Sequence, residues 1–162
     1  MPTSDPMTIL LAHDRWATER LLEACDGLSE DQFHQAFEMG PGSLHDTITH
    51  MLSALRGWGD LLAGRPVGGP IEPVNRPVND LRALHTELAD AFARHVRPVE
   101  EKVSGERGGR AYTFTRGGVV THVCTHGMHH RAQCLNMLRH LGIAPLPPSS
   151  VVEWMLMADD QG

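Results

Sequence analysis

Two histidines, His126 and His130, lie four residues apart in a segment whose apolar spacing is helical. In an α-helix this spacing places both imidazoles on one face, one turn apart, in the same narrow arc as Val119 and Met137. A neutral imidazole in an apolar interior needs partners for one N–H and one lone pair. A shared metal ion takes up one lone pair from each ring, so the spacing favours a metal site. The alternative is a pair of core histidines that are hydrogen-bonded to carbonyl groups.

Helices must position these side chains, because apolar residues recur three and four positions apart along most of the chain. Glycine, proline and capping residues then set the expected ends. The first helix, of about 20 residues, begins near Met7 and ends near Gly27; the second runs from an N-cap at Ser43 to Gly64; the third covers 81–96, before Pro98; and the fourth runs from about Gly118 to Leu141.

A long connection separates the second and third helices, because residues 64–77 contain three glycines and four prolines. A short alternation at 111–115 predicts a small hairpin, and residues 151–157 predict either a short capping helix or a C-terminal strand. The expected fold class is all-α, a four-helix bundle with one long crossover. The whole chain, 1–162, is expected to be a single domain.

Composition narrows the classes of partner. The formal net charge is −6 and Lys102 is the one lysine, which disfavours nucleic acid as a partner. The start of the sequence lacks the pattern of a signal peptide, and no stretch approaches 18 apolar residues, so no membrane segment is expected. Three cysteines without a CxxC pair indicate a reducing compartment, and we expect a cytoplasmic protein. These thiols are not convincing nucleophiles.

Helical geometry alone does not choose a third ligand. His50 lies on the flank of the second helix's apolar stripe, whereas His85 and His95 lie closer to the stripe of the third helix. His122 continues the histidine series of the fourth helix one turn earlier. The remaining candidates fall at expected surface positions, and these are His13, His34 and His140.

The fourth-helix run Thr-His-Val-Cys-Thr-His-Gly-Met-His-His-Arg-Ala-Gln, followed by Leu-Arg-His-Leu-Gly, resembles the signature of the DinB-like (DinB/YfiT) superfamily. The first helix, with His-Asp-Arg-Trp-Ala, and the second, with Leu-His-Asp-Thr-Ile-Thr-His, are similar to that superfamily as well. The resemblance implies a four-helix bundle, often a homodimer, with a divalent metal held by His50, His126 and His130. Two positions depart from the pattern: Ala132 replaces the usual glycine, and Ser149-Ser150 replaces an acidic residue.

Two further side chains are candidates for supporting these ligands. Asp14 is the one charged residue within the apolar seam of the first helix. There it would accept a hydrogen bond from a ligand histidine, face a bundle end open to water, or pair with Arg131. His122 is the other candidate for this outer role. Tyr112 and Arg116 are candidates for lining a pocket. The three tryptophans fit packing or a dimer face better than a cofactor site.

Three imidazoles suit Zn, Ni, Fe or Cu and leave at least one coordination position open, as in catalytic sites. Some members of the resembled superfamily are thiol S-transferases or thiol-dependent isomerases, which implies a metal-dependent enzyme acting on a small molecule with a low-molecular-weight thiol as cosubstrate. A hydrolase would use the same open position for water. The alternatives are a non-catalytic metal-binding or stress-response protein of the same fold, and a metal-free dimeric bundle.

Overall fold

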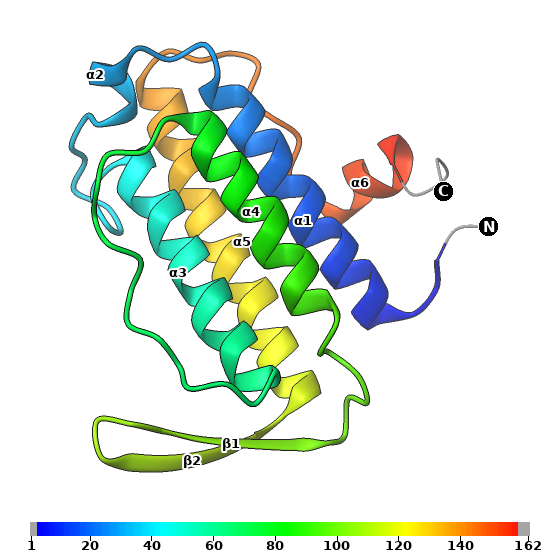
Figure 1. The fold of residues 1–162 in the computed structure, drawn as a ribbon. Coiled ribbons are helices and arrows are strands. Elements are labelled where there is room, and N and C mark those ends of the chain that lie inside the picture. Colours follow the sequence, from blue (N-terminus) through cyan, green and yellow to red (C-terminus); the bar gives the residue numbers. More distant parts are fainter. Residues whose placement is uncertain (1–2, 159–162) are drawn as a thin grey trace.

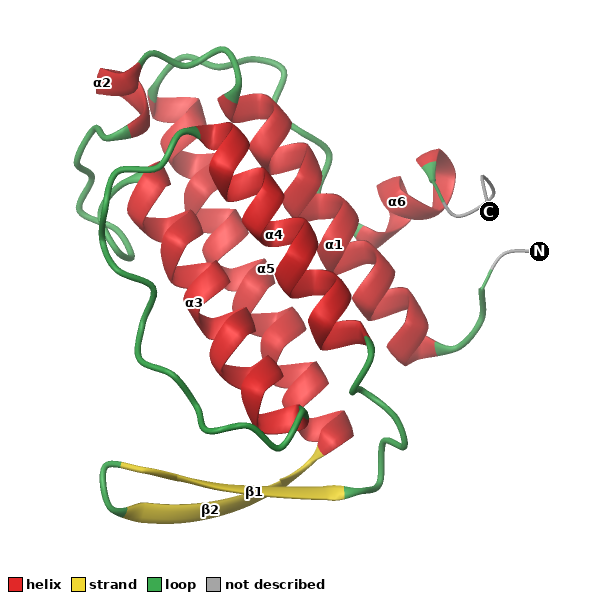
Figure 2. Cartoon of the chain, viewed as in Figure 1, coloured by secondary structure: helices red, strands yellow, loops and turns green. Residues whose placement is uncertain are grey.

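The computed structural model describes residues 3–158, and four long helices form its body (Figures 1 and 2). The elements in chain order are α1 (Pro6–Cys25), α2 (Glu30–Phe33), α3 (Leu44–Leu62), α4 (Val78–Ala93), β1 (Lys102–Arg107), β2 (Arg110–Thr115), α5 (Arg116–His140) and α6 (Val151–Met157). The bundle consists of α1, α3, α4 and α5, each of which packs against two of the others. The all-α four-helix fold predicted from the sequence is confirmed. The ends of the expected 1–162 domain, residues 1–2 and 159–162, lie outside the described part.

Side-chain caps begin α3 and α5 at or near the residues that the sequence predicts, whereas α4 begins at Val78, before the expected residue 81, and has no side-chain cap. The Ser43 hydroxyl accepts a hydrogen bond from the backbone N–H of Asp46 at 3.0 Å, and so begins α3 at the expected residue. The Thr115 hydroxyl does the same for Gly118 at the start of α5. These bonds satisfy N–H groups that have no partner within the helix. Residues 151–157 form a helix, so the first of the two expectations for this segment is confirmed.

The crossover between α3 and α4 follows the outside of the bundle along its full length (Figure 1). As a result α3 and α4 run in the same direction, and α1 and α5 run in the opposite one (Figure 1). The β1–β2 hairpin closes the end of the bundle where α3 ends and α5 begins. The small hairpin predicted from the alternation at 111–115 is thus observed; that alternation lies in its second strand, and the first strand, Lys102–Arg107, pairs with it over six residues.

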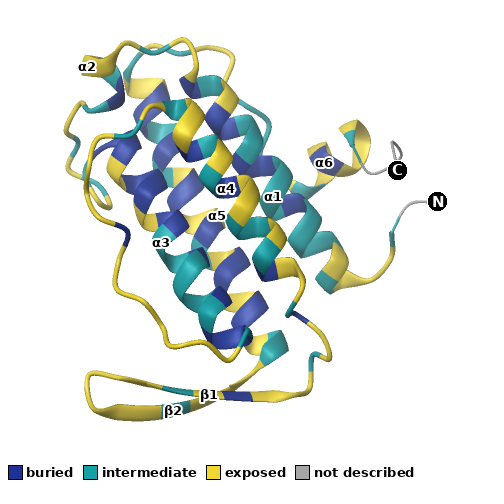
Figure 3. Cartoon of the chain, viewed as in Figure 1, coloured by how far each residue is buried: buried dark blue, intermediate teal, exposed yellow. Residues whose placement is uncertain are grey.

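Buried residues line the inward faces of the helices (Figure 3). The apolar ones among them form two clusters, one after the other along the bundle. On α5 the first cluster begins at Cys134 and the second ends at Cys124. On α3 the corresponding limits are Leu52 and Leu55. Residues 126–131 of α5, which include His126, His130 and Arg131, therefore occupy the boundary between the clusters. No helix among residues 3–158 combines the length and apolarity that a membrane span needs.

One expected surface histidine is buried. The prediction for His13 was wrong: its side chain lies under the chain that leads into α6, and its ring Nε2 is 2.8 Å from the carbonyl oxygen of Ser149. Helical periodicity places His13 beside the apolar seam of α1 but does not reveal that the C-terminal segment covers this flank. His34 is half-buried and His140 is exposed.

Candidate metal centre

His50 of α3 and His126 and His130 of α5 form one cluster, with one nitrogen from each ring lying within 4.8 Å of the others. The Nε2 atoms of His50 and His126 are 3.1 Å apart, and the His130 ring centroid lies 4.6 Å from that of His50 and 4.5 Å from that of His126. The structure thus brings together the three residues that the sequence resemblance names. His85 and His95 lie on α4 and the turn after it, outside the cluster.

The electrostatics of the cluster favour the neutral form of His50 and His126, which is the form that binds a metal. Burial, and next the charge that His130 would carry, lower the pKa of His50. Burial lowers the pKa of His126 to about 4, with further contributions from His130 and His50. His50 and His126 therefore each offer a neutral lone pair near pH 7. A divalent cation among the three rings would accept one lone pair from each, so the donor set fits a transition metal.

Gln133 fixes the orientation of His130. The ring Nδ1 lies 2.7 Å from the Gln133 Oε1, and because an amide oxygen only accepts, Nδ1 donates and Nε2 keeps the lone pair. Gly40, in the loop before α3, allows this arrangement: a Cβ at Gly40 would lie 2.2 Å from the same Oε1. Sequence reasoning noted Gln133 only as part of the superfamily motif. Its position three residues after His130, on the same helix face, was the available signal.

The cluster lies at one end of a pocket of about 840 Å³ between α3, the crossover and the hairpin. His50 and His126 line that end, and Trp58 and Tyr112 line its sides. The volume is within the range typical of small-molecule sites. Tyr112 thus lines a pocket as expected, whereas Arg116 does not: its guanidinium donates to Glu101 and to the carbonyl oxygens of Leu62 and His95.

Comparison with known proteins assigns the fold to a family. The family model described as "DinB family" matches residues 1–154. The chain belongs to the DinB family. This confirms the superfamily that the histidine motif indicated.

The DinB-family chain is 19% identical to "Protein DinB" of Bacillus subtilis (strain 168) over 151 residues, which cover 85% of this chain and 87% of that relative. Its structure is similar to the crystal structure of the DinB-like protein YjoA from Bacillus subtilis. The TM-score is 0.68, with 14% sequence identity, and the match covers 87% of this chain and 96% of that chain. At this identity the likeness establishes the shared fold.

Asp14, one of the two candidates for supporting the ligands, pairs with Arg131 in this DinB-family bundle. The Arg131 Nη1 donates to the Asp14 Oδ1 at 2.6 Å and to the Thr18 hydroxyl at 3.2 Å, and Arg131 is only 3% exposed. Of the interpretations left open by the sequence, the ion pair with Arg131 is the one observed. Burial raises the pKa of the Asp14 carboxyl, and Arg131 opposes that rise. Gly127 makes room for the pair, since a Cβ there would lie 2.5 Å from the Asp14 Oδ1.

His122, the other such candidate, is an exposed residue at the edge of the pocket. Its ring centroid lies 5.7 Å from that of His126 and 5.0 Å from that of Trp58. Within residues 3–158 its ring makes no hydrogen bond to any of the three clustered histidines. His122 therefore extends the wall of the pocket in this structure.

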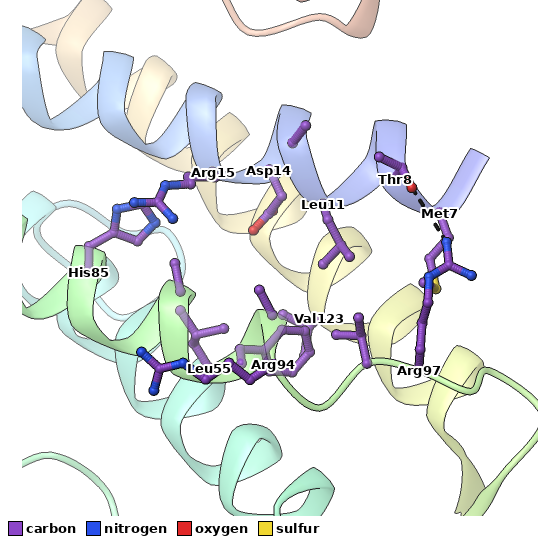
Figure 4. A pocket seen from close by; sticks show the side chains of 15 residues that line it. Met7, Thr8, Leu11, Asp14, Arg15, Leu55, His85, Arg94, Arg97 and Val123 are labelled. Atoms are coloured by element: carbon purple, nitrogen blue, oxygen red, sulfur yellow. Dashed lines mark hydrogen bonds between the residues drawn. The ribbon is translucent and has the colours of Figure 1, made fainter. Parts of the chain in front are cut away.

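A second pocket, of about 420 Å³, lies between α1 and α4 and contains none of the three clustered histidines. Figure 4 shows Asp14 and Arg15 of α1 facing His85 of α4 across it. The His85 Nδ1 is buried and has no hydrogen-bond partner among the described residues. Burial lowers the pKa of His85 to about 4, and the nearby Arg15 and Arg131 lower it further. His85 is therefore a neutral core residue.

The three cysteines, Cys25, Cys124 and Cys134, are free and buried. Burial raises the pKa of Cys124 to about 12, so its thiolate form is disfavoured near neutral pH. None of the three lines the pocket beside the histidine cluster. A nucleophilic sulfur at that site would have to come from a bound thiol.

Proposed function

We propose that this chain is a metal-dependent enzyme that uses the centre formed by His50, His126 and His130 to activate a low-molecular-weight thiol, as a thiol S-transferase does. The observation that carries the proposal is a cluster of three imidazoles at the end of a pocket of about 840 Å³. Three protein ligands leave a coordination position open for an exogenous group. When bound there, a divalent ion such as Zn, Ni or Fe lowers the pKa of a coordinated thiol or water.

The residues of the chain are sufficient for thiol transfer. Glu106 of the hairpin is the one carboxylate among the described residues of the pocket, and His122, with its ring centroid 5.7 Å from that of His126, is a second group there that could act as a general base, as hydrolysis would use. An S-transfer depends on neither of them: the thiol proton leaves to solvent, the sulfur bonds to an electrophilic carbon, and the leaving group departs with the electron pair of the broken bond.

A non-catalytic metal-binding or stress-response protein is the second candidate, favoured by the exposure of His50 at the pocket mouth. Such a site would exchange its metal with solvent without needing a substrate. The homodimer implied by the resemblance, and the cytoplasmic location, stay predictions.

Metal analysis of protein purified without a metal-affinity tag tests the proposal. We expect about one transition metal per chain in the wild type and in the control His140→Ala, an exposed histidine at the far end of α5, and none in His50→Ala, His126→Ala or His130→Ala. Absence of metal from the wild type, even after reconstitution, would contradict the metal centre and leave a metal-free bundle.

A second measurement separates the two candidate functions. Cobalt-loaded protein is titrated with glutathione, bacillithiol and mycothiol, and a thiolate-to-cobalt absorption band reports sulfur coordination. Consumption of a thiol together with an electrophile such as chlorodinitrobenzene then reports transfer. Metal binding with neither signal would support the non-catalytic protein.

A further inference from the structure

The end of the β1–β2 hairpin carries two arginines directly opposite each other. Arg107 and Arg110 are cross-strand partners on either side of the turn Gly108–Gly109. Both glycines have positive φ, 59° and 76°, as a two-residue hairpin turn requires. Both arginine side chains are exposed, and neither guanidinium forms a hydrogen bond or ion pair within residues 3–158. Like charges placed opposite each other destabilise a hairpin, so this pair needs an explanation.

These arginines share one face of the hairpin with its aromatic residues. Side chains alternate between the two faces of a strand, so Tyr112 and Phe114 lie on the same face as Arg110. Tyr112 reaches across its partner Gly105, where a Cβ would lie 2.9 Å from the tyrosine ring. Glu106 alternates to the opposite face, which also carries the hydrogen bond between Ser104 and Thr113. The face with Arg107, Arg110 and the rings contributes to the pocket wall.

A continuous series of rings connects this face to the histidine cluster. The Tyr112 and Phe114 rings are stacked with centroids 5.3 Å apart, and Phe114 meets Trp58 edge-on at 5.9 Å. From Trp58 the series continues to His122 at 5.0 Å and then to His126 at 5.7 Å. The pocket is therefore lined by histidines, by a series of aromatic rings and by the hairpin, where two arginines outnumber the one carboxylate, Glu106. A ligand that matches these features would have a reacting group at one end, a planar apolar body in the middle and an anionic group at the other end.

We propose that this pocket binds an organic anion with a planar apolar body, whose carboxylate, sulfonate or phosphate group is held by Arg107 and Arg110 while its rings stack along Trp58 and Phe114. Paired guanidinium groups bind such anions through several charge-assisted hydrogen bonds. An anion between the two arginines would also relieve their mutual repulsion. The assignment of this anion as the second substrate of the transfer rests on the proposed function, whereas the anion site itself does not.

Binding of anilinonaphthalene sulfonate, compared with the same ring system lacking the sulfonate, phenylnaphthylamine, tests the inference. We expect Arg107→Gln/Arg110→Gln to weaken binding of the sulfonate about tenfold or more and that of the neutral probe less than about twofold. The control Arg94→Gln/Arg97→Gln makes the same change of net charge in the other pocket and should leave both affinities unchanged. Trp58→Leu should weaken both probes.

Several outcomes would overturn the inference. One is that the wild type shows no measurable binding of the sulfonate. Another is that the Arg107 and Arg110 variant loses affinity equally for the charged and the neutral probe. A third is that the Arg94 and Arg97 control, and not this variant, loses affinity for the sulfonate. Naphthoate should displace the sulfonate probe. Displacement by glutathione and not by naphthoate would show that the arginines bind the thiol cosubstrate, and would contradict a ligand with a planar apolar body. Metal content measured on the same samples keeps the two proposals apart, because a metal-free wild type that discriminates the probes contradicts only the proposed function.

Discussion

At the scale of single residues, the three clustered histidines are held to different degrees. His130 is buried, and its ring is fixed by the hydrogen bond to Gln133, whereas His50 is exposed and makes its one hydrogen bond to His126 itself. A buried, oriented ligand pre-organises a site, and an exposed ligand can move to complete it. His130 is therefore the fixed member of the cluster.

Replacing Gln133 should weaken metal binding without removing a ligand. Gln133→Leu removes the acceptor for the His130 Nδ1, so the ring loses its fixed orientation, and we expect metal affinity to fall about 10- to 100-fold. Gln133→Glu keeps an acceptor oxygen in the same place and should retain affinity. Competition with a chromophoric chelator measures both variants. Equal affinities for the wild type and Gln133→Leu would show that packing alone orients His130.

The Asp14–Arg131 pair should contribute to stability only as an intact pair. Asp14→Asn leaves the buried guanidinium without a counter-charge, and we expect the free energy of unfolding to fall by about 3 kcal/mol. Asp14→Leu/Arg131→Met removes both charges and should recover most of that loss. Asp26→Asn, which breaks the exposed pair with Arg82, should cost less than about 1 kcal/mol. Urea denaturation tests this, and a double variant no more stable than Asp14→Asn would contradict it.

At the scale of elements, the loop before α3 reaches α5 through Gly40. Gly40 has a positive φ of 51° and lies against the Gln133 side chain, so this loop helps to fix the residue of α5 that orients His130. The loop and the cluster are thereby coupled although they lie far apart in the sequence.

Replacing Gly40 with alanine should show whether its contact with Gln133 affects metal binding, apart from the backbone strain that alanine causes at a positive φ. Gly40→Ala places a Cβ 2.2 Å from the Gln133 Oε1, so the amide must move and His130 must lose its partner. Gly64→Ala is the matched control, because Gly64 also has a positive φ, 69°, but a Cβ there would meet nothing within 4 Å. Both variants should lose about 1 kcal/mol of stability, and only Gly40→Ala should lose metal affinity. Equal metal affinity in the two would remove Gly40 from the site.

The long helices could be predicted from sequence because their ends carry strong local signals, such as Ser43 before α3. The short helix α2 was missed, although Ser29 and Gln32 form the capping box that marks its start. Helical spacing alone indicated His126 and His130 as candidate ligands. His50 required the family resemblance, because it lies on the flank of the apolar stripe of α3, and only the packing of α3 beside α5 turns that flank toward the cluster. Hydrophobic periodicity describes one helix at a time and cannot supply that relation.

At the scale of the whole molecule, the bundle has two apolar clusters with a polar layer between them. That layer contains the histidine cluster on the side of α3 and the Asp14–Arg131 pair on the side of α1. His85 lies at the same level on α4 and is also buried. Polar groups enclosed between two apolar clusters are sensitive to their protonation state, because each added charge must be taken out of water.

The stability of the metal-free bundle should therefore fall on mild acidification, and His85 should account for part of the loss. Its pKa is about 4 in the folded chain, against an ordinary value near 6.5, because burial and the facing Arg15 and Arg131 outweigh Asp90. Between these values the unfolded chain binds a proton that the folded chain does not. The neutral ring is thus fully tolerated above about pH 6.5, and stability decreases as pH falls toward 4.

We expect His85 to contribute about 2 kcal/mol of the stability lost between pH 7 and pH 5. Urea denaturation of chelator-treated wild type and His85→Leu across this range tests it, since chelation removes the effect of metal release. If the wild type is the more stable at neutral pH, the two curves of unfolding free energy against pH should converge on acidification. If leucine packs better and the variant is already the more stable, the curves should move further apart. In both cases the wild type has the steeper pH dependence. Parallel curves would show that His85 keeps its ordinary protonation in the fold, and that the polar layer admits water beside α4.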